Sequence, residues 1–317
     1  MPDRARHRSS PLSHRILRMT RGDRPWLIRS IFVVTIILSG CAATDSSDPA
    51  PQRATPTPAE VATPSAKPSL SSSPSAVPSA PEGGAYLAIG DSVTFGIGVP
   101  QPRRDAFPAR LADRLATADP PITETRVFAV PGETARGFLE RRLDDVLAAI
   151  DELGTRVEVV TIGLGANELL QVRREPPCEV DPDGEVCTSA VGDATAEAAA
   201  ALEAVVASVQ QALDDRGSTA RVLVLAYYNP DVEPVAVTTV VGPDGVVRCD
   251  PADATPGLND RIACVAEARG VELVDLYAAF LGREAELTRI GDGDVHPNEA
   301  GHDVIAQTIA AALGVAP

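Results

Sequence analysis

The chain has 317 residues and carries 28 basic and 44 acidic side chains, which give a formal net charge of −16. Such an acidic surface repels nucleic acid and anionic lipid headgroups, so the composition argues against a nucleic-acid partner. Residues 85–317, the part of the chain whose composition suits a folded protein, are enough for one sizeable α/β domain.

The N-terminus has the pattern of an export signal. Residues 1–30 contain eight arginines and two acids, and an apolar run follows at 31–38. This run is shorter than the about 20 apolar residues that span a bilayer, so the pattern predicts a lipoprotein-type signal peptide over 1–40 rather than a retained transmembrane helix. Removing this segment would change the net charge to about −22.

The segment ends in Leu-Ser-Gly-Cys, which resembles the bacterial lipobox, where the cysteine is modified with diacylglycerol. Cys41 is therefore the predicted lipidation site, and a diacyl anchor would hold the protein in the cell envelope, at the outer face of the bacterial cytoplasmic membrane. The alternative is an ordinary cleavage site beside an incidental cysteine. Residues 41–84, rich in Pro, Ser, Thr and Ala, are predicted to form a disordered tether.

The remaining residues, 85–317, alternate short apolar runs with helical patterns, which is typical of parallel strands joined by crossover helices. Five strands with intervening helices predict an α/β fold, a three-layer α/β/α sandwich with a five-stranded, mainly parallel sheet of the flavodoxin-like kind. The expected strands are 85–89, 126–129, 157–163, 221–226 and 271–276, and the expected helices are 107–116, 139–153, 194–215, 258–268 and 300–313.

Two long connections, 171–192 and 229–256, carry or adjoin the four cysteines that follow Cys41. An even number of cysteines in an oxidising compartment predicts two disulfides. Local pairing is one of three connectivities, and zinc ligation is disfavoured because the short two-residue spacing of zinc sites is missing. The local pairs are Cys178 with Cys187 and Cys249 with Cys264.

The first expected strand ends in Gly-Asp-Ser, at 90–92. A sharp turn at the carboxyl end of a parallel strand is where α/β folds place reactive groups, so Ser92 is a candidate nucleophile. The alternative is a turn with a capping serine. Asp91 is expected to bind nearby backbone amides within this turn.

A serine nucleophile needs a base, and imidazole titrates near neutral pH. Export would remove two of the four histidines, His7 and His14, leaving His296 and His302. His296 follows Gly-Asp-Gly-Asp-Val in a loop before the last expected helix, and a neighbouring carboxylate could orient its ring. The competing interpretations are a histidine at a helix start beside solvated acids, or a calcium loop, which lacks the required glutamate. His302 is expected to be a structural or exposed helix residue.

Four short blocks in order resemble the SGNH (GDSL) hydrolase family. They are Gly-Asp-Ser at 90–92, Val-Pro-Gly-Glu-Thr at 130–134, Gly-Ala-Asn-Glu at 165–168 and His-Pro-Asn at 296–298, and the resemblance spans about residues 86–313.

The resemblance implies that Ser92 attacks an acyl carbonyl and that His296 is its general base. The backbone N–H groups of Ser92 and Gly132 and the side-chain amide of Asn167 would form the oxyanion hole. It implies no metal and no cofactor.

The sequence departs from the family pattern at two places. The third block usually ends Asn-Asp and here has Glu168 after the asparagine, and the usual position of the triad acid holds Gly293. We therefore predict Asp294 as the acid, with Asp292 as the second candidate and a Ser/His dyad oriented by a backbone carbonyl as the third.

The function that follows is an extracytoplasmic serine esterase acting on acyl or acetyl esters of a small molecule, a lipid or a polysaccharide. We expect a monomer that meets the membrane only through its lipid anchor. An acyltransferase that uses the same acyl-enzyme and a non-catalytic carbohydrate-binding lipoprotein are the alternatives.

Overall fold

The computed structural model describes residues 83–229, 240–242, 245–253 and 255–315. The predicted signal peptide, Cys41 and all but the last two residues of the predicted tether lie outside the described residues. Among the helices of the described part, none combines the length and the apolar character needed to cross a membrane.

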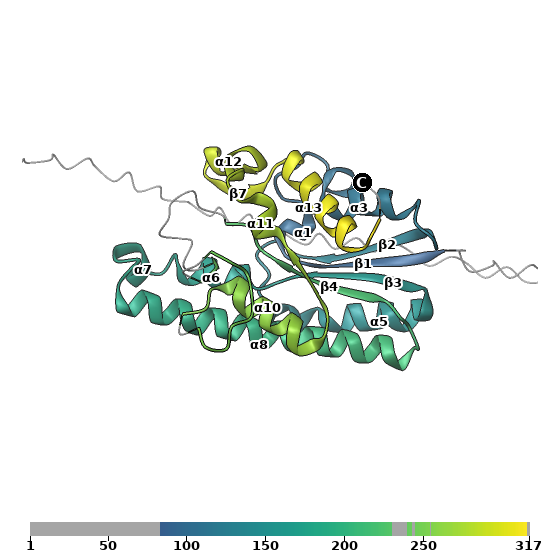
Figure 1. The fold of residues 1–317 in the computed structure, drawn as a ribbon, viewed down its shortest axis with the longest axis horizontal. Helices are drawn as coiled ribbons and strands as arrows, with labels where there is room; N and C mark the ends of the chain where they lie inside the picture. Colours follow the sequence, from purple (N-terminus) through teal and green to yellow (C-terminus); the bar gives the residue numbers. More distant parts are fainter. Residues whose placement is uncertain (1–82, 230–239, 243–244, 254, 316–317) are drawn as a thin grey trace, which may run out of the picture. The chain divides into compact units, whose positions relative to one another are not determined.

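A parallel five-stranded sheet lies at the centre of the fold (Figure 1), as predicted. The strand order is β2-β1-β3-β4-β5, so the chain leaves β1 first to one side and then crosses to the other. Loops that follow two neighbouring strands on either side of such a switch diverge and leave a crevice at the carboxyl ends. The strands are β1 (Gly84–Gly90), β2 (Ile122–Ala129), β3 (Val157–Gly163), β4 (Arg221–Ala226) and β5 (Glu272–Asp275).

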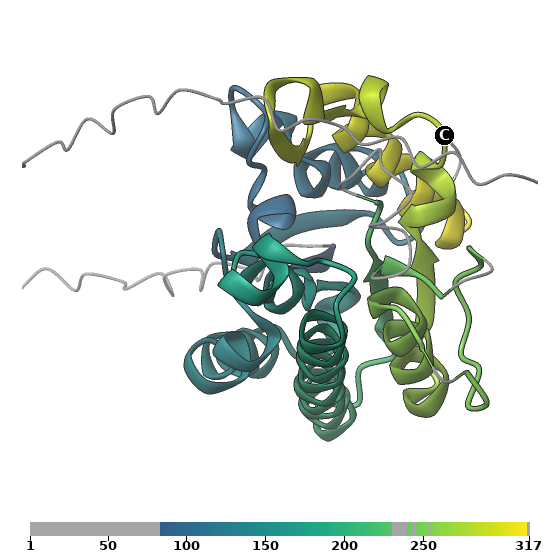
Figure 2. The same ribbon diagram turned by 90° about the vertical axis from the view of Figure 1, so that its left-hand side faces the viewer.

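Helices cover both faces of the sheet (Figures 1 and 2) and complete the predicted three layers. Successive side chains of a strand point to opposite faces, so Leu87 and Ile89 of β1 join one core while Tyr86 and Ala88 join the other. One face packs against α3 (Phe107–Leu115) and α13 (Glu299–Ala312), and the other packs against α5 (Leu143–Leu153), α8 (Glu185–Asp215) and α10 (Leu258–Arg269).

Short elements fill the connections. They are α1 (Ser92–Phe95), α2 (Pro102–Asp105), α4 (Ala135–Arg141), the 3-10 turn η1 (Gly154–Arg156), α6 (Ala166–Val172), α7 (Pro176–Val180), α11 (Leu276–Phe280), α12 (Glu284–Leu287), the 3-10 turn η2 (Ile290–Asp292), and the antiparallel pair β6 (Thr288–Arg289) and β7 (Asp294–Pro297).

The structure corrects two of the expected elements. The expected helix at 139–153 is two helices, α4 and α5, because Arg142 leaves the helical conformation with φ −126°. The expected connection at 171–192 is largely helical, since it contains α7 and the first two turns of α8. Apolar periodicity is weak there, so the pattern did not reveal these turns.

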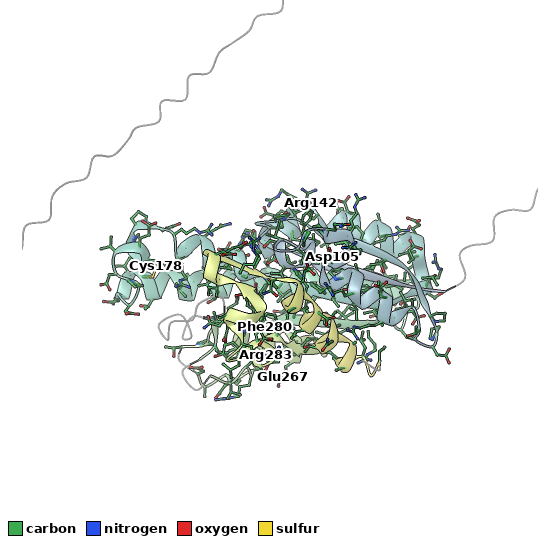
Figure 3. The ribbon with its side chains drawn as sticks, turned by 90° about the horizontal axis from the view of Figure 1, so that it is seen from above. Asp105, Arg142, Cys178, Glu267, Phe280 and Arg283 are labelled. Atoms are coloured by element: carbon green, nitrogen blue, oxygen red, sulfur yellow. A yellow bond between two sulfur atoms is a disulfide. The ribbon has the colours of Figure 1, made fainter. Side chains whose placement is uncertain are left out.

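Both local disulfides are present. The Cys178–Cys187 bridge joins α7 to the start of α8, and the two Cα atoms are 4.8 Å apart. Figure 3 labels Cys178. Cys249–Cys264 ties the connection after β4 to α10 with a Cα separation of 4.5 Å. Cross-linking restricts the unfolded chain, so each bridge stabilises the segment that it closes.

Candidate active site

The strand-to-helix turn after β1 presents Ser92 at the carboxyl edge of the sheet. Glycine is required at position 90, because a Cβ there would lie 2.1 Å from Oγ1 of Thr94. Asp91 caps α1, and its Oδ1 accepts a hydrogen bond from the N–H of Val93 at 2.9 Å, as the sequence led us to expect. Ser92 is 8% exposed. Because it is the first residue of α1, its backbone N–H has no partner within the helix.

The fold brings His296 to Ser92 across 204 residues of sequence. Nε2 of His296 lies 2.9 Å from Oγ of Ser92, and Nδ1 lies 2.5 Å from Oδ1 of Asp294. An ionised carboxylate only accepts, so the ring proton sits on Nδ1 and leaves Nε2 free to accept from the serine hydroxyl. This is the arrangement of a nucleophile, a base and an orienting acid.

The same carboxylate also holds the backbone of the histidine. Oδ1 of Asp294 accepts from the N–H of His296 at 3.1 Å, and Oδ2 lies 3.5 Å from Nη1 of Arg289. Partial burial pushes the pKa of Asp294 up, but the hydrogen bonds from His296 and the charge of Arg289 outweigh it and leave this pKa below its usual value. Asp294 is therefore ionised at neutral pH.

The other candidate acid is placed differently. The side chain of Asp292 is 73% exposed and lies 3.8 Å from Arg289. Between the two acids, Gly293 adopts a left-handed conformation with φ +75°, which ends the turn η2 and starts β7. The geometry thus favours Asp294 over Asp292, with a spacing of two residues before the histidine.

The second block forms a turn whose chemistry follows from its sequence. The N–H of Glu133 donates to the carbonyl of Val130 at 3.1 Å, and Gly132 has φ +79°. Proline followed by a glycine with positive φ is typical of a type II turn, so Pro131 and Gly132 suit these positions. The turn sets the Gly132 N–H beside the cavity that Ser92 lines.

Three candidate oxyanion donors line this cavity. Within the described part of the chain, the N–H groups of Ser92 and Gly132 have no protein acceptor. The side-chain amide of Asn167, at the start of α6, donates to the carbonyl of Glu133 at 2.8 Å and lies 3.4 Å from Oδ2 of Asp91. These contacts hold the amide against the second block, with Asp91 beside it.

Glu168 gives a structural reason for the departure in the third block. Its Oε1 accepts from the N–H of Ala135 at 2.7 Å and from that of Arg136 at 3.3 Å, which caps the start of α4. Its Oε2 is buried without a partner in the described chain. Burial raises the pKa of Glu168 above its usual value. The longer acid therefore ties the third block to the helix that follows the second.

Two tyrosines at the end of β4 support the site, although no motif in the sequence pointed to them. The hydroxyl of Tyr227 donates to Oδ2 of Asp91 at 2.8 Å, and that of Tyr228 donates to the carbonyl of Val295 at 2.8 Å. Burial raises the pKa of Asp91 to about 6, although the hydrogen bonds from the Val93 N–H and the Tyr227 hydroxyl oppose the shift. The signal that could have revealed them is their position just after a parallel strand.

The second histidine of the domain has a structural place. His302 is fully buried on α13, its Nδ1 accepts from the N–H of Phe107 at 3.2 Å, and its Nε2 is 3.3 Å from the carbonyl of Ile97. Burial lowers the pKa of His302 to about 4, so the ring is neutral. It holds α3 and the loop after α1 against α13.

The cavity above Ser92 has a volume of about 360 Å³. Its walls are mostly apolar or aromatic, and the described residues contain no cluster of three acidic, histidine or cysteine side chains that could hold a metal ion. A mostly apolar cleft with few polar groups at one end is typical of a small-molecule site. Among the lining residues are Ser92, Gly132, Leu169, Leu170, Arg174, Val240 and Leu258.

The profile of the GDSL-like Lipase/Acylhydrolase family matches residues 88–304. The solved structure of Lip_vut3, a lipase from a goat rumen metagenome, matches with a TM-score of 0.55 at 23% identity and covers 72% of this chain and 97% of that one. Axe2, an acetylxylan esterase from Geobacillus stearothermophilus, matches with a TM-score of 0.50 at 19% identity, covering 73% and 94%. At such identities these two structures show a shared fold. No curated protein sequence gives a significant match.

Proposed function

Because the chain belongs to the GDSL-like lipase/acylhydrolase family and acts on ester bonds, we propose that it is an extracytoplasmic serine esterase that forms an acyl-enzyme on Ser92. The observation that carries this proposal is the continuous hydrogen-bonded line from Ser92 through His296 to Asp294. It ends at a serine oxygen that lines a cavity large enough for a small acyl group.

In the first half of the reaction, Oγ of Ser92 bonds to the ester carbonyl carbon while its proton passes to Nε2 of His296. Asp294 stabilises the resulting imidazolium through Nδ1. The tetrahedral intermediate then collapses, the bond to the alcohol oxygen breaks, and the proton on Nε2 leaves with the alcohol. General acid–base transfer of this kind contributes about 10²- to 10⁴-fold to rate.

The negative charge that develops on the carbonyl oxygen is stabilised by donors. The N–H groups of Ser92 and Gly132 and the amide of Asn167 supply them from three different strand ends. Losing one such donor typically costs about 3 to 4 kcal/mol in the transition state. Asn167 would exchange its present acceptor, the carbonyl of Glu133, for the oxyanion.

In the second half, water takes the place of the alcohol. His296 accepts a proton from the water as its oxygen bonds to the acyl carbon, and the proton returns to Oγ of Ser92 as the acid leaves. The mostly apolar cavity of about 360 Å³ supports short or medium acyl groups, since it lies at the small end of ligand sites.

The cellular location forms part of the proposal. A cationic start, a short apolar run and the lipobox-like end at Cys41 support export followed by lipid anchoring. The two disulfides fit an oxidising compartment. Metabolic labelling with an alkyne fatty acid tests the anchor: we expect label on the wild type and none on Cys41→Ser, whose release from the membrane fraction should follow. Labelled Cys41→Ser would contradict the anchor site.

A fluorophosphonate probe tests the nucleophile. We expect labelling of the wild type and its loss in Ser92→Ala and His296→Ala, together with loss of 4-nitrophenyl butyrate hydrolysis. Ser208→Ala is the matched control, because among the described residues the Ser208 hydroxyl bonds only within its own helix, to the carbonyl of Ala204. Labelling that persists in Ser92→Ala would refute the assignment.

Product analysis in the presence of glycerol separates hydrolysis from transfer. Free butyrate as the main product supports an esterase, because water then completes the second half. Glyceryl butyrate as the main product would make the protein an acyltransferase and overturn the hydrolytic half of the proposal.

A further inference from the structure

One charged side chain of the cavity has no role in the catalytic steps. Arg174 lines the same cavity as Ser92 and is exposed at its edge. Many arginines of the described chain form ion pairs, as Arg114 and Arg126 do. Arg174 has no carboxylate partner and no side-chain hydrogen bond within the described part of the chain. In a protein with a net charge of −16, a guanidinium without such a partner beside a catalytic serine stands out.

The position of Arg174 relative to the reacting end follows from its place in the turn just after α6. Asn167 and Leu170 lie on one face of α6 as positions i and i+3, Arg174 lies two residues beyond the end of this helix, and all three line the cavity. The N–H of Arg174 continues the helical turn by donating to the carbonyl of Gln171 at 3.1 Å. At about 1.5 Å per residue to the end of α6 and about 2 Å per residue in the turn that follows, the Arg174 backbone lies roughly 11 Å from that of Asn167.

The space between these two ends is apolar. Leu170 of α6 lies between them along the chain, and Leu169, Val240 and Leu258 contribute to the same walls. The other ionisable groups of the cavity among the described residues are already engaged: Asp91 accepts from Tyr227, and His296 lies between Ser92 and Asp294. Arg174 is therefore the cation left to meet a bound ligand there.

We propose that Arg174 binds a negatively charged group of the substrate, a carboxylate or a phosphate held by an apolar spacer some distance from the ester bond. The planar guanidinium can donate two parallel hydrogen bonds to such a group. The proposal rests on the proposed function, since it names the class of ester that the same site prefers. It concerns a specificity-determining residue and leaves the acyl transfer steps unchanged.

Matched ester pairs test the charge preference. The first pair has the charge in the acyl part: 4-nitrophenyl hydrogen suberate and its neutral methyl ester. The second has it in the alcohol part: 6-acetoxyhexanoate and its neutral methyl ester, with 6-acetoxyhexyl phosphate as the phosphate arm. For each pair, the quantity measured is kcat/KM of the charged ester divided by that of the neutral one.

We expect this ratio to fall about tenfold in Arg174→Gln for at least one pair, as suits one charge-assisted contact. Arg174→Lys should fall less, and rising ionic strength should lower the ratio in the wild type because salt screens exposed charges. The pair whose ratio falls identifies whether the acyl part or the alcohol part of the substrate carries the anion. Comparing 6-acetoxyhexyl phosphate with 6-acetoxyhexanoate identifies whether Arg174 prefers a phosphate or a carboxylate.

The matched control is Arg103→Gln, which removes the same charge from an exposed position on α2, outside this cavity. A ratio that stays within twofold in Arg174→Gln for every pair, or that falls equally in Arg103→Gln, would overturn the role of Arg174. That outcome differs from failure of the proposed function, in which the wild type hydrolyses neither the charged nor the neutral esters.

Discussion

Replacing Asp294 by Asn tests whether this carboxylate orients and stabilises His296. The substitution keeps the size of the side chain but removes the charge that faces Nδ1 at 2.5 Å. If the new amide nitrogen faces Nδ1, the ring must also carry its proton on Nε2, where it can no longer accept from Ser92. We therefore expect a fall in kcat with little change in KM.

The size of the effect follows from the exposure of the pair. The side chains of His296 and Asp294 are 21% and 29% exposed, so an effective dielectric constant of about 20 applies, at which two charges about 4 Å apart interact by about 4 kcal/mol. The amide dipole of Asn retains part of this, which leaves a loss of about 3 kcal/mol. At about 1.4 kcal/mol for each tenfold step, kcat should fall about 10²-fold.

Hydrolysis of 4-nitrophenyl butyrate measures this change, and Asp292→Asn is the matched control. The Asp292 side chain is 73% exposed and, within the described part of the chain, pairs only with Arg289 at 3.8 Å, so we expect the kcat of this variant within about twofold of the wild type. Wild-type activity in Asp294→Asn, or a larger loss in Asp292→Asn, would refute the assignment of the acid. Full activity in both variants would favour a dyad oriented by a backbone carbonyl.

Substitutions at three further positions test the surroundings of the site. Asn167→Ala removes one oxyanion donor, so kcat for the same ester should fall about 10²- to 10³-fold, and an effect confined to KM would contradict this role. His302 has a pKa near 4 in the folded state and an ordinary value of 6.5, so stability present above pH 6.5 is lost as the pH falls towards 4. In urea unfolding, the difference in unfolding free energy between wild type and His302→Gln should therefore narrow by about 3 kcal/mol from pH 7 to pH 4. A difference that stays constant would show that folding does not lower the pKa of His302. Glu168→Ala leaves the N–H of Ala135 unpaired and should cost about 1 to 2 kcal/mol in the same measurement, while Glu168→Gln keeps the acceptor and should stay near the wild type; equal losses would mean that the charge matters rather than the cap.

The strands and the reactive turns could be predicted from local sequence because their causes are local. The strands at 157–163 and 221–226 appear with the predicted bounds, since each is a short run of branched apolar residues that becomes buried. The turn at Pro131 and Gly132 depends only on the fixed φ of proline and on glycine's tolerance of positive φ. Resemblance in four such blocks was sufficient for the family.

Helix boundaries in the weakly patterned segments were less legible. Residues 176–193 have no clear apolar repeat, and their helices are held in place by the Cys178–Cys187 bridge and by packing along α8. Such stabilisation comes from contacts that a local window of sequence does not contain.

The sequence by itself determined the fold class, pointed to the two disulfides between cysteines near each other in the chain, and identified Ser92 and His296 as the candidate nucleophile and base. Only the tertiary structure decided which acid faces the histidine, that Tyr227 supports Asp91 from the end of β4, and that Arg174 shares a cavity with Ser92. Each of these depends on distances between strand ends and helix faces, which the sequence of a single element does not contain. Periodicity records which way a side chain faces within its own element, whereas the partner it meets is set by how the elements pack.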